Sequence, residues 1–191
     1  MLMKLNLSSE IVLNNVPEEI YHPATAIDRS ELTRFEKIQT DIFPKPEEGT
    51  VYLADCIEQV IKQKQREGKF CVLGLGTGLS LTPVYQELIR RYKENTLSFH
   101  NVIIFNAYEY FPITANTSNS TINQLKERFL NHVDVDFKNV FTLDGSITQD
   151  KVQSHCRLFE ERMESFGGID IMLLGIGRIG NIATNEPGST I

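Results

Sequence analysis

The fold is decided by the stretch Phe70-Cys71-Val72-Leu73-Gly74-Leu75-Gly76-Thr77-Gly78-Leu79-Ser80, in which an apolar run typical of a buried strand passes directly into a glycine-rich turn. The same arrangement recurs near the end of the chain, at Ile169-Asp170-Ile171-Met172-Leu173-Leu174-Gly175-Ile176-Gly177-Arg178-Ile179-Gly180. Open α/β sheets bind ligands at the carboxyl ends of their strands, and glycine lets the backbone come close to an anion. The two turns therefore predict a site for a phosphorylated small molecule.

Helical and strand patterns alternate along the chain, which predicts parallel βαβ units with right-handed crossovers. Continuous apolar runs predict strands over residues 70–75, 102–105, 140–143 and 169–174. Helical spacing predicts helices over 51–65, 81–89, 120–132 and 148–166, with Ser80 and Thr82 as candidate caps of the second. The expected fold class is α/β, a doubly wound, mostly parallel sheet flanked by helices and Rossmann-like in character.

The 191 residues suit one main domain with an additional N-terminal segment. Prolines interrupt regular structure throughout residues 1–48, so we expect an arm packed on a domain formed by residues 49–191. Nothing after the second glycine turn could pair with the sheet or cover it. We therefore expect this domain to be truncated at its C-terminus, with the native polypeptide continuing after Ile191.

Composition argues against several classes of protein. The net charge is −6 and the longest basic block is Arg90-Arg91, so the chain has no electrostatic footprint for nucleic acid. Three separated cysteines form no CxxC, and the four histidines lack metal-ligand spacing, so we expect no metal and no other cofactor. The sequence has neither a signal-peptide pattern nor an apolar run of about 20 residues, which predicts a cytoplasmic protein with no membrane partner.

The first glycine turn offers amide and hydroxyl donors to a phosphate, and its candidate ligands are Gly76, Thr77, Gly78 and Ser80. A tight structural turn without a ligand is an equal alternative on this segment alone. The second turn formally matches the dinucleotide fingerprint G-x-G-x-x-G, which keeps a nicotinamide-dependent oxidoreductase open as an alternative. The fingerprint usually opens a fold, however, so a structural turn explains residues 175–180 better.

Two carboxylates follow predicted strands. Glu109 lies where an open sheet places a catalytic acid or base, although a solvated surface position is the commoner explanation for such a residue. Glu186 is the stronger candidate, because Asn185 and Pro187 flank it in a polar loop close to the second glycine turn.

Three segments taken together resemble the glucosamine-6-phosphate deaminase (isomerase) family and the broader group that includes 6-phosphogluconolactonase. They are Leu73–Gly78, Leu97–Tyr110 and Leu174–Ser189, and the resemblance extends from about residue 37 to the end of the chain. It implies a doubly wound α/β fold and a homo-oligomer. It also implies an activity, the conversion of glucosamine 6-phosphate and water to fructose 6-phosphate and ammonia.

The resemblance also assigns roles to individual residues. It implies that Gly76, Thr77, Gly78 and Ser80 hold the sugar phosphate together with Ser189 of the last segment, and Asn185 is a further candidate for substrate binding. The basic phosphate ligands of the family would follow Ile191.

The catalytic positions depart from the family pattern. The family has an aspartate that moves the proton between C1 and C2 of the sugar where this chain has Tyr108, and a ring-opening histidine where it has Asn181. Ile179 occupies a position that is often acidic or hydroxylic, and only Glu186, which orients the family's histidine, is retained. A phenol is a poor substitute for a carboxylate base near neutral pH, and an amide cannot carry a proton.

The sequence therefore predicts a glucosamine-6-phosphate deaminase-like protein of amino-sugar metabolism, with impaired or altered catalysis and a sugar phosphate as its small-molecule partner. Other functions remain open. One is a non-catalytic phosphosugar-binding or regulatory module, and another is the oxidoreductase suggested by residues 175–180. A third is a domain of a larger polypeptide in which a neighbouring domain performs the chemistry.

Overall fold

The computed structural model describes residues 25, 27, 40–186 and 188. By its internal contacts the chain divides into one unit up to Gly49 and a second from Thr50, and the sheet belongs to the second. The expected arm over residues 1–48 lies largely outside the described residues.

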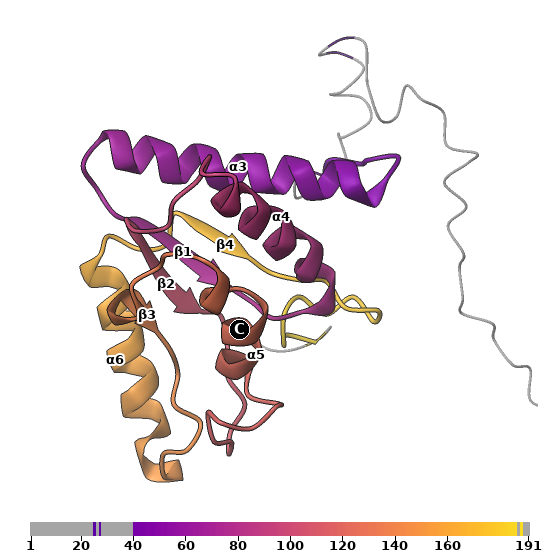
Figure 1. The fold of residues 1–191 in the computed structure, drawn as a ribbon. Coiled ribbons are helices and arrows are strands. Elements are labelled where there is room, and N and C mark those ends of the chain that lie inside the picture. Colours follow the sequence, from indigo (N-terminus) through magenta and orange to yellow (C-terminus); the bar gives the residue numbers. More distant parts are fainter. Residues whose placement is uncertain (1–24, 26, 28–39, 187, 189–191) are drawn as a thin grey trace, which may run out of the picture. The chain divides into compact units, whose positions relative to one another are not determined.

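The centre of the second unit is a parallel sheet in the order β3-β2-β1-β4 (Figure 1). Its strands are β1 (Cys71–Leu75), β2 (Val102–Asn106), β3 (Val140–Phe141) and β4 (Ile171–Leu173). Every neighbouring pair is parallel, and the chain builds outward from β1 to β3 before β4 returns to the other side of β1. The order thus reverses between β1 and β4, where open α/β sheets bind their ligands.

Helices cover both faces of the sheet (Figure 1). They are α3 (Pro46–Arg66), α4 (Thr82–Lys93), α5 (Thr121–Arg128) and α6 (Val152–Ser165). One core cluster joins α3, α4 and α5 to alternate strand residues such as Leu73 and Ile104. The opposite cluster joins Ile103 and Phe105 to α6. The strands are apolar throughout because both faces are buried, and this confirms the predicted doubly wound, mostly parallel α/β fold.

Several predicted boundaries were wrong. Helix α3 begins at Pro46, five residues before the predicted start, because proline is tolerated in a first turn and Glu47 and Glu48 favour a helix N-terminus. The predicted helix 120–132 ends as α5 at Arg128 and continues as a separate 3₁₀ turn, η3 (Leu130–His132). Phe129 leaves the helical backbone at this point, and its ring lies 5.1 Å from that of Tyr85 in the core.

The N-terminus of α4 also differs from the prediction. A 3₁₀ turn, η2 (Leu79–Leu81), leads directly into the helix, and neither Ser80 nor Thr82 forms a side-chain cap. The backbone N–H groups of Leu81 and Thr82 donate instead to the carbonyls of Gly78 and Leu79. None of the helices among the described residues is long and apolar enough to cross a bilayer.

Candidate functional site

The two glycine turns lie side by side at the carboxyl ends of β1 and β4. The N–H of Gly76 donates to the carbonyl of Leu173 at 3.0 Å, so the strand pairing extends into the first turn. A Cβ on Gly175 would lie 2.9 Å from Ser80 Oγ and 3.9 Å from the Cα of Gly78. The two backbones therefore meet at close range, and the structure brings together Gly78, Ser80 and the start of the second turn.

The first turn presents unused amide donors. Among the described residues, no acceptor takes the N–H of Gly78, Leu79 or Ser80, because the 3₁₀ turn bonds begin only at Leu81. Consecutive free N–H groups at such a turn form a concavity that favours an anion. The arrangement can therefore hold a phosphate through the backbone and the exposed Ser80 hydroxyl.

Three side chains form hydrogen bonds with the backbone of this turn. Tyr85 on α4 donates its hydroxyl to the carbonyl of Gly76. Arg128 at the end of α5 donates Nη1 to the carbonyl of Thr77 at 2.6 Å. The third is Tyr108, whose hydroxyl lies 3.4 Å from both the N and the Oγ1 of Thr77. No local pattern in the sequence marks Arg128 for this role, because it lies 51 residues from its partner.

Tyr108 lies against the first turn. A Cβ on Gly76 would be 3.5 Å from its ring atom Cε1, so the ring packs on the glycine backbone. Its hydroxyl accepts the N–H of Thr77, which is 7 % exposed. The main chain of Tyr108 is fixed as well, because its carbonyl accepts a hydrogen bond from the Thr121 hydroxyl. Tyr108 thus contacts one amide of the candidate phosphate turn.

Glu109 is not the solvated surface residue that the sequence favoured. Its carboxylate accepts hydrogen bonds from the Ser120 hydroxyl at 2.7 Å and from the backbone N–H groups of Thr121 and Ile122 at 3.0 and 3.3 Å. Partial burial would raise the pKa of Glu109, but these hydrogen bonds and one from the Tyr110 N–H outweigh it, and the pKa lies below its ordinary value. Glu109 therefore caps the N-terminus of α5 from a distant loop and holds the segment that carries Tyr108.

The second glycine turn folds back on itself. Gly177 donates its N–H to the carbonyl of Asn181 at 2.8 Å, and a Cβ on Gly177 would lie 2.0 Å from Asn181 Oδ1. Asn181 Nδ2 in turn donates to the carbonyl of Ala183 at 2.8 Å. The Asn181 side chain therefore stabilises its own loop, while Ile179 is 67 % exposed.

The geometry of this segment argues against the dinucleotide alternative. Residues 175–186 form turns and isolated bridges that pair Ile182 with Ile176 and Asn185, and they contain no helix. A dinucleotide fingerprint must open a helix whose N-terminus receives the pyrophosphate. The segment that matches G-x-G-x-x-G is therefore a structural turn.

The remaining candidates lie near the end of the described chain. Asn185 and Glu186 are exposed, and among the described residues no hydrogen bond or ion pair joins the Glu186 carboxylate to the other candidates. Ser189 lies outside the described residues. In the part of the chain that the structure describes, no group of three His, Cys, Asp or Glu side chains could hold a metal ion.

The sheet order and the paired turns define the class: a doubly wound α/β protein with two glycine turns at its topological switch point. A family model described as glucosamine-6-phosphate isomerases/6-phosphogluconolactonase matches residues 44–189, and the chain belongs to this family.

Similar proteins carry the same family names. A glucosamine-6-phosphate deaminase-like protein of Bacteroides thetaiotaomicron is 57% identical over 189 residues, which are 99% of this chain and 28% of the relative. The glucosamine-6-phosphate deaminase of Dictyostelium discoideum is 39% identical over 144 residues, which are 71% of this chain and 53% of the relative. The chain thus spans about a quarter of the first relative and about half of the second.

Two solved structures are similar to this chain. A monomeric glucosamine-6-phosphate deaminase matches with a TM-score of 0.69 and 35% identity, over 76% of this chain and 58% of that one. The 6-phosphogluconolactonase of Thermotoga maritima matches with a TM-score of 0.59 and 19% identity, over 71% and 59% of the two chains, and shows the shared fold alone.

Proposed function

We propose that this chain forms the phosphosugar-binding part of a glucosamine-6-phosphate deaminase-like protein of amino-sugar metabolism, in which the deaminase chemistry is impaired or altered. The family assignment and the names of the relatives support the substrate class. The departures at Tyr108, Ile179 and Asn181 support the change in chemistry.

One observation carries the proposal: the free N–H groups of Gly78, Leu79 and Ser80 lie beside a tyrosine in place of the family's carboxylate. The amides and the Ser80 hydroxyl bind the phosphate. The Tyr108 hydroxyl can exchange hydrogen bonds with a sugar hydroxyl, but a phenol does not take a proton from carbon as a carboxylate does. Binding is therefore retained while proton transfer between C1 and C2 is lost or slowed.

A non-catalytic binding or regulatory module is the second candidate. The Asn181 side chain favours it, because its amide already donates to the carbonyl of Ala183 and an amide cannot protonate a ring oxygen. Glu186, which would orient a histidine at this position, then has no catalytic partner to orient. In this case the ligand would stabilise the protein without being converted.

The test uses the full-length protein that contains this chain, with glucosamine 6-phosphate as ligand. We expect saturable binding by calorimetry and ammonia release far below the usual enzyme range of about 1 to 10³ s⁻¹. Ser80→Ala should weaken binding about fivefold by removing one hydroxyl donor. The matched control is Ser154→Ala on α6, where the hydroxyl donates only to the carbonyl of Lys151.

Two outcomes would contradict the proposal in different ways. Turnover within the usual range would show an intact deaminase and refute the loss of proton transfer. Absence of binding at millimolar glucosamine 6-phosphate would refute the phosphosugar site itself. Binding without turnover would select the second candidate over a slow enzyme.

A further inference from the structure

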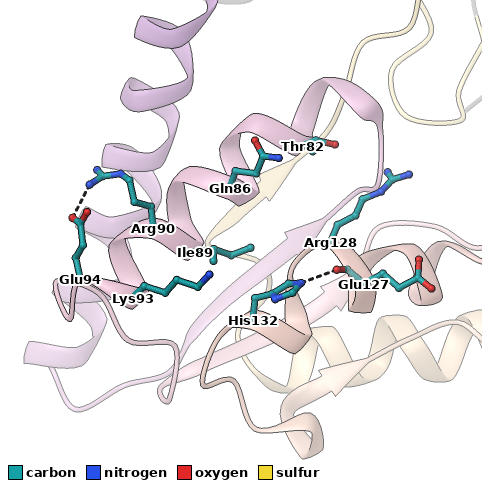
Figure 2. Close-up of a pocket in the computed structure, with 9 residues that line it drawn as sticks. All are labelled: Thr82, Gln86, Ile89, Arg90, Lys93, Glu94, Glu127, Arg128 and His132. Carbon is teal, nitrogen blue, oxygen red and sulfur yellow. Dashed lines mark hydrogen bonds and ion pairs between the residues drawn. The ribbon is translucent and has the colours of Figure 1, made fainter.

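A cavity of about 590 Å³ lies between α4 and α5 (Figure 2). Pockets that hold small metabolites have volumes of about 300–1,000 Å³, so this one has room for such a ligand. The nine residues that line it come from the two helices and the turns that follow them: Thr82, Gln86, Ile89, Arg90, Lys93, Glu94, Glu127, Arg128 and His132. None of them is a candidate residue of the glycine turns.

Two cations from opposite helices face this cavity. Figure 2 shows Lys93 extending from α4 toward His132, and Arg128 extending from α5 toward the beginning of α4. Within residues 40–186, Lys93 Nζ has neither a hydrogen bond nor an ion pair. Arg128 donates Nη1 to the carbonyl of Thr77, a neutral group that leaves the guanidinium charge uncompensated.

The carboxylates of the lining do not neutralise these cations. Glu94 lies 2.6 Å from Arg90, a contact that Figure 2 draws as a dashed line. Glu127 Oε1 accepts a hydrogen bond from Asn123 Nδ2 at 3.1 Å, and the carboxylate points away from Lys93. The cavity therefore keeps an excess of positive charge between its walls.

Further polar groups and one apolar side chain complete the lining. His132 Nε2 lies 2.9 Å from the carbonyl of Glu127, and because a carbonyl only accepts, Nε2 carries the hydrogen and Nδ1 remains for another partner. Thr82 Oγ1 is buried and has no hydrogen-bond partner among the described residues. Gln86 adds an amide and Ile89 an apolar wall, a combination that suits a small organic anion better than a bare ion.

We propose that the cavity between α4 and α5 is a second anion-binding site, which takes inorganic phosphate or the phosphate of a small monoester at Lys93, while Arg128 adds positive charge at the end of the cavity near the start of α4. The site is distinct from the glycine turns and does not rest on the proposed function. It is connected to them, because the same Arg128 that faces the cavity supports the carbonyl of Thr77.

The test follows backbone amide NMR signals of the full-length protein during titration with inorganic phosphate and, separately, with glucose 6-phosphate at constant ionic strength. We expect saturable changes in the amide chemical shifts of α4 and of residues 127–132, where the cavity lies. Lys93→Gln should weaken the binding about tenfold, as expected for loss of a charged hydrogen-bond partner. Lys151→Gln is the matched control, because Lys151 is exposed beside α6 and outside the cavity.

Lys93 is the residue to change because Arg128 also supports the first glycine turn, and replacing Arg128 would disturb both places. Shifts confined to residues 74–80 and 174–180 would overturn the proposal and leave the glycine-turn site intact. Binding by Lys93→Gln equal to that of the unmodified protein would overturn it as well. Tighter binding of glucose 6-phosphate than of phosphate would support a monoester ligand, and the reverse order would support free phosphate.

Discussion

Glu109→Gln tests whether one carboxylate positions the loop that carries Tyr108. The carboxylate accepts from two donors on each oxygen: the N–H groups of Tyr110 and Thr121 on Oε1, and the Ser120 hydroxyl and the Ile122 N–H on Oε2. Glutamine has nearly the same shape but replaces one oxygen with an NH₂ group. In the variant, two of these four donors therefore face the NH₂ group, which is itself a donor and cannot accept their hydrogen bonds.

The expected loss follows from these contacts. The Ser120 hydroxyl can rotate to accept from the new NH₂ group, but the Ile122 N–H loses its acceptor, and the remaining bonds lose the negative charge. Hydrogen bonds to charged groups contribute about 1.5–3 kcal/mol, and loss of a helix N-cap costs about 0.5–2 kcal/mol. We expect the free energy of unfolding to fall by about 2 kcal/mol, which lowers the melting temperature of a domain of this size by about 4–8 °C.

The pH dependence provides a second measurement with a definite sign. The pKa of Glu109 is lowered in the folded protein, so the carboxylate contributes stability that is fully present above its unfolded pKa. That stability is lost as the pH falls through the folded pKa, because the protonated acid then resembles the glutamine variant. Urea unfolding should therefore show a difference in unfolding free energy between the unmodified protein and Glu109→Gln. This gap should be widest at pH 7 and narrow below about pH 4.

Glu127→Gln is the matched control on the same helix. Its carboxylate is exposed and its contact is one hydrogen bond from Asn123. We expect its unfolding free energy to stay within about 0.5 kcal/mol of the unmodified protein. An equal loss in both variants would refute the capping argument, and so would a gap for Glu109→Gln that does not change with pH.

Three further changes test individual contacts in the second unit. Tyr108→Phe removes the hydroxyl that can bond a sugar hydroxyl and should weaken glucosamine 6-phosphate binding about threefold by calorimetry, whereas unchanged or tighter binding would show that the hydroxyl contacts only Thr77. The Arg91 side chain is 9% exposed and pairs with three carboxylates, those of Asp55, Glu58 and Glu87. Arg91→Gln removes this common partner and should lower the free energy of unfolding, measured in urea, by about 3 kcal/mol. The exposed Arg90→Gln serves as its control, and an equal loss there would contradict the role of burial. Gly145→Ala places a Cβ 2.3 Å from a backbone carbonyl oxygen and should lower the melting temperature sharply, so an unchanged melting curve would refute that contact.

Local patterns were enough to predict the sheet. Strands β1 and β2 were predicted within one residue at each end, because both faces of these strands are buried and their apolar runs are continuous. The third strand was predicted over 140–143 but contains only Val140 and Phe141. Residue type alone does not show where pairing with the neighbouring strand stops.

The supports of the site could not be predicted in the same way. Glu109 caps a helix that begins 12 residues later, and Arg128 reaches a turn 51 residues earlier. Their partners depend on how the elements pack, which no helical or strand period encodes. The Asn181 side chain is a different case, because its partner is only two residues away, but its inward rotamer follows from the space left by Gly177.

The arrangement around residue 108 separates the fold from the chemistry. Backbone bonds hold this segment on both sides: the N–H of Ala107 donates to the carbonyl of Leu75, and the Thr121 hydroxyl donates to the carbonyl of Tyr108. Glu109 adds the cap of α5 immediately afterwards. Because none of these contacts uses the side chain at position 108, a carboxylate or a phenol can stand there on the same backbone. The side chain beside the first glycine turn can therefore change without a change in the sheet that positions it.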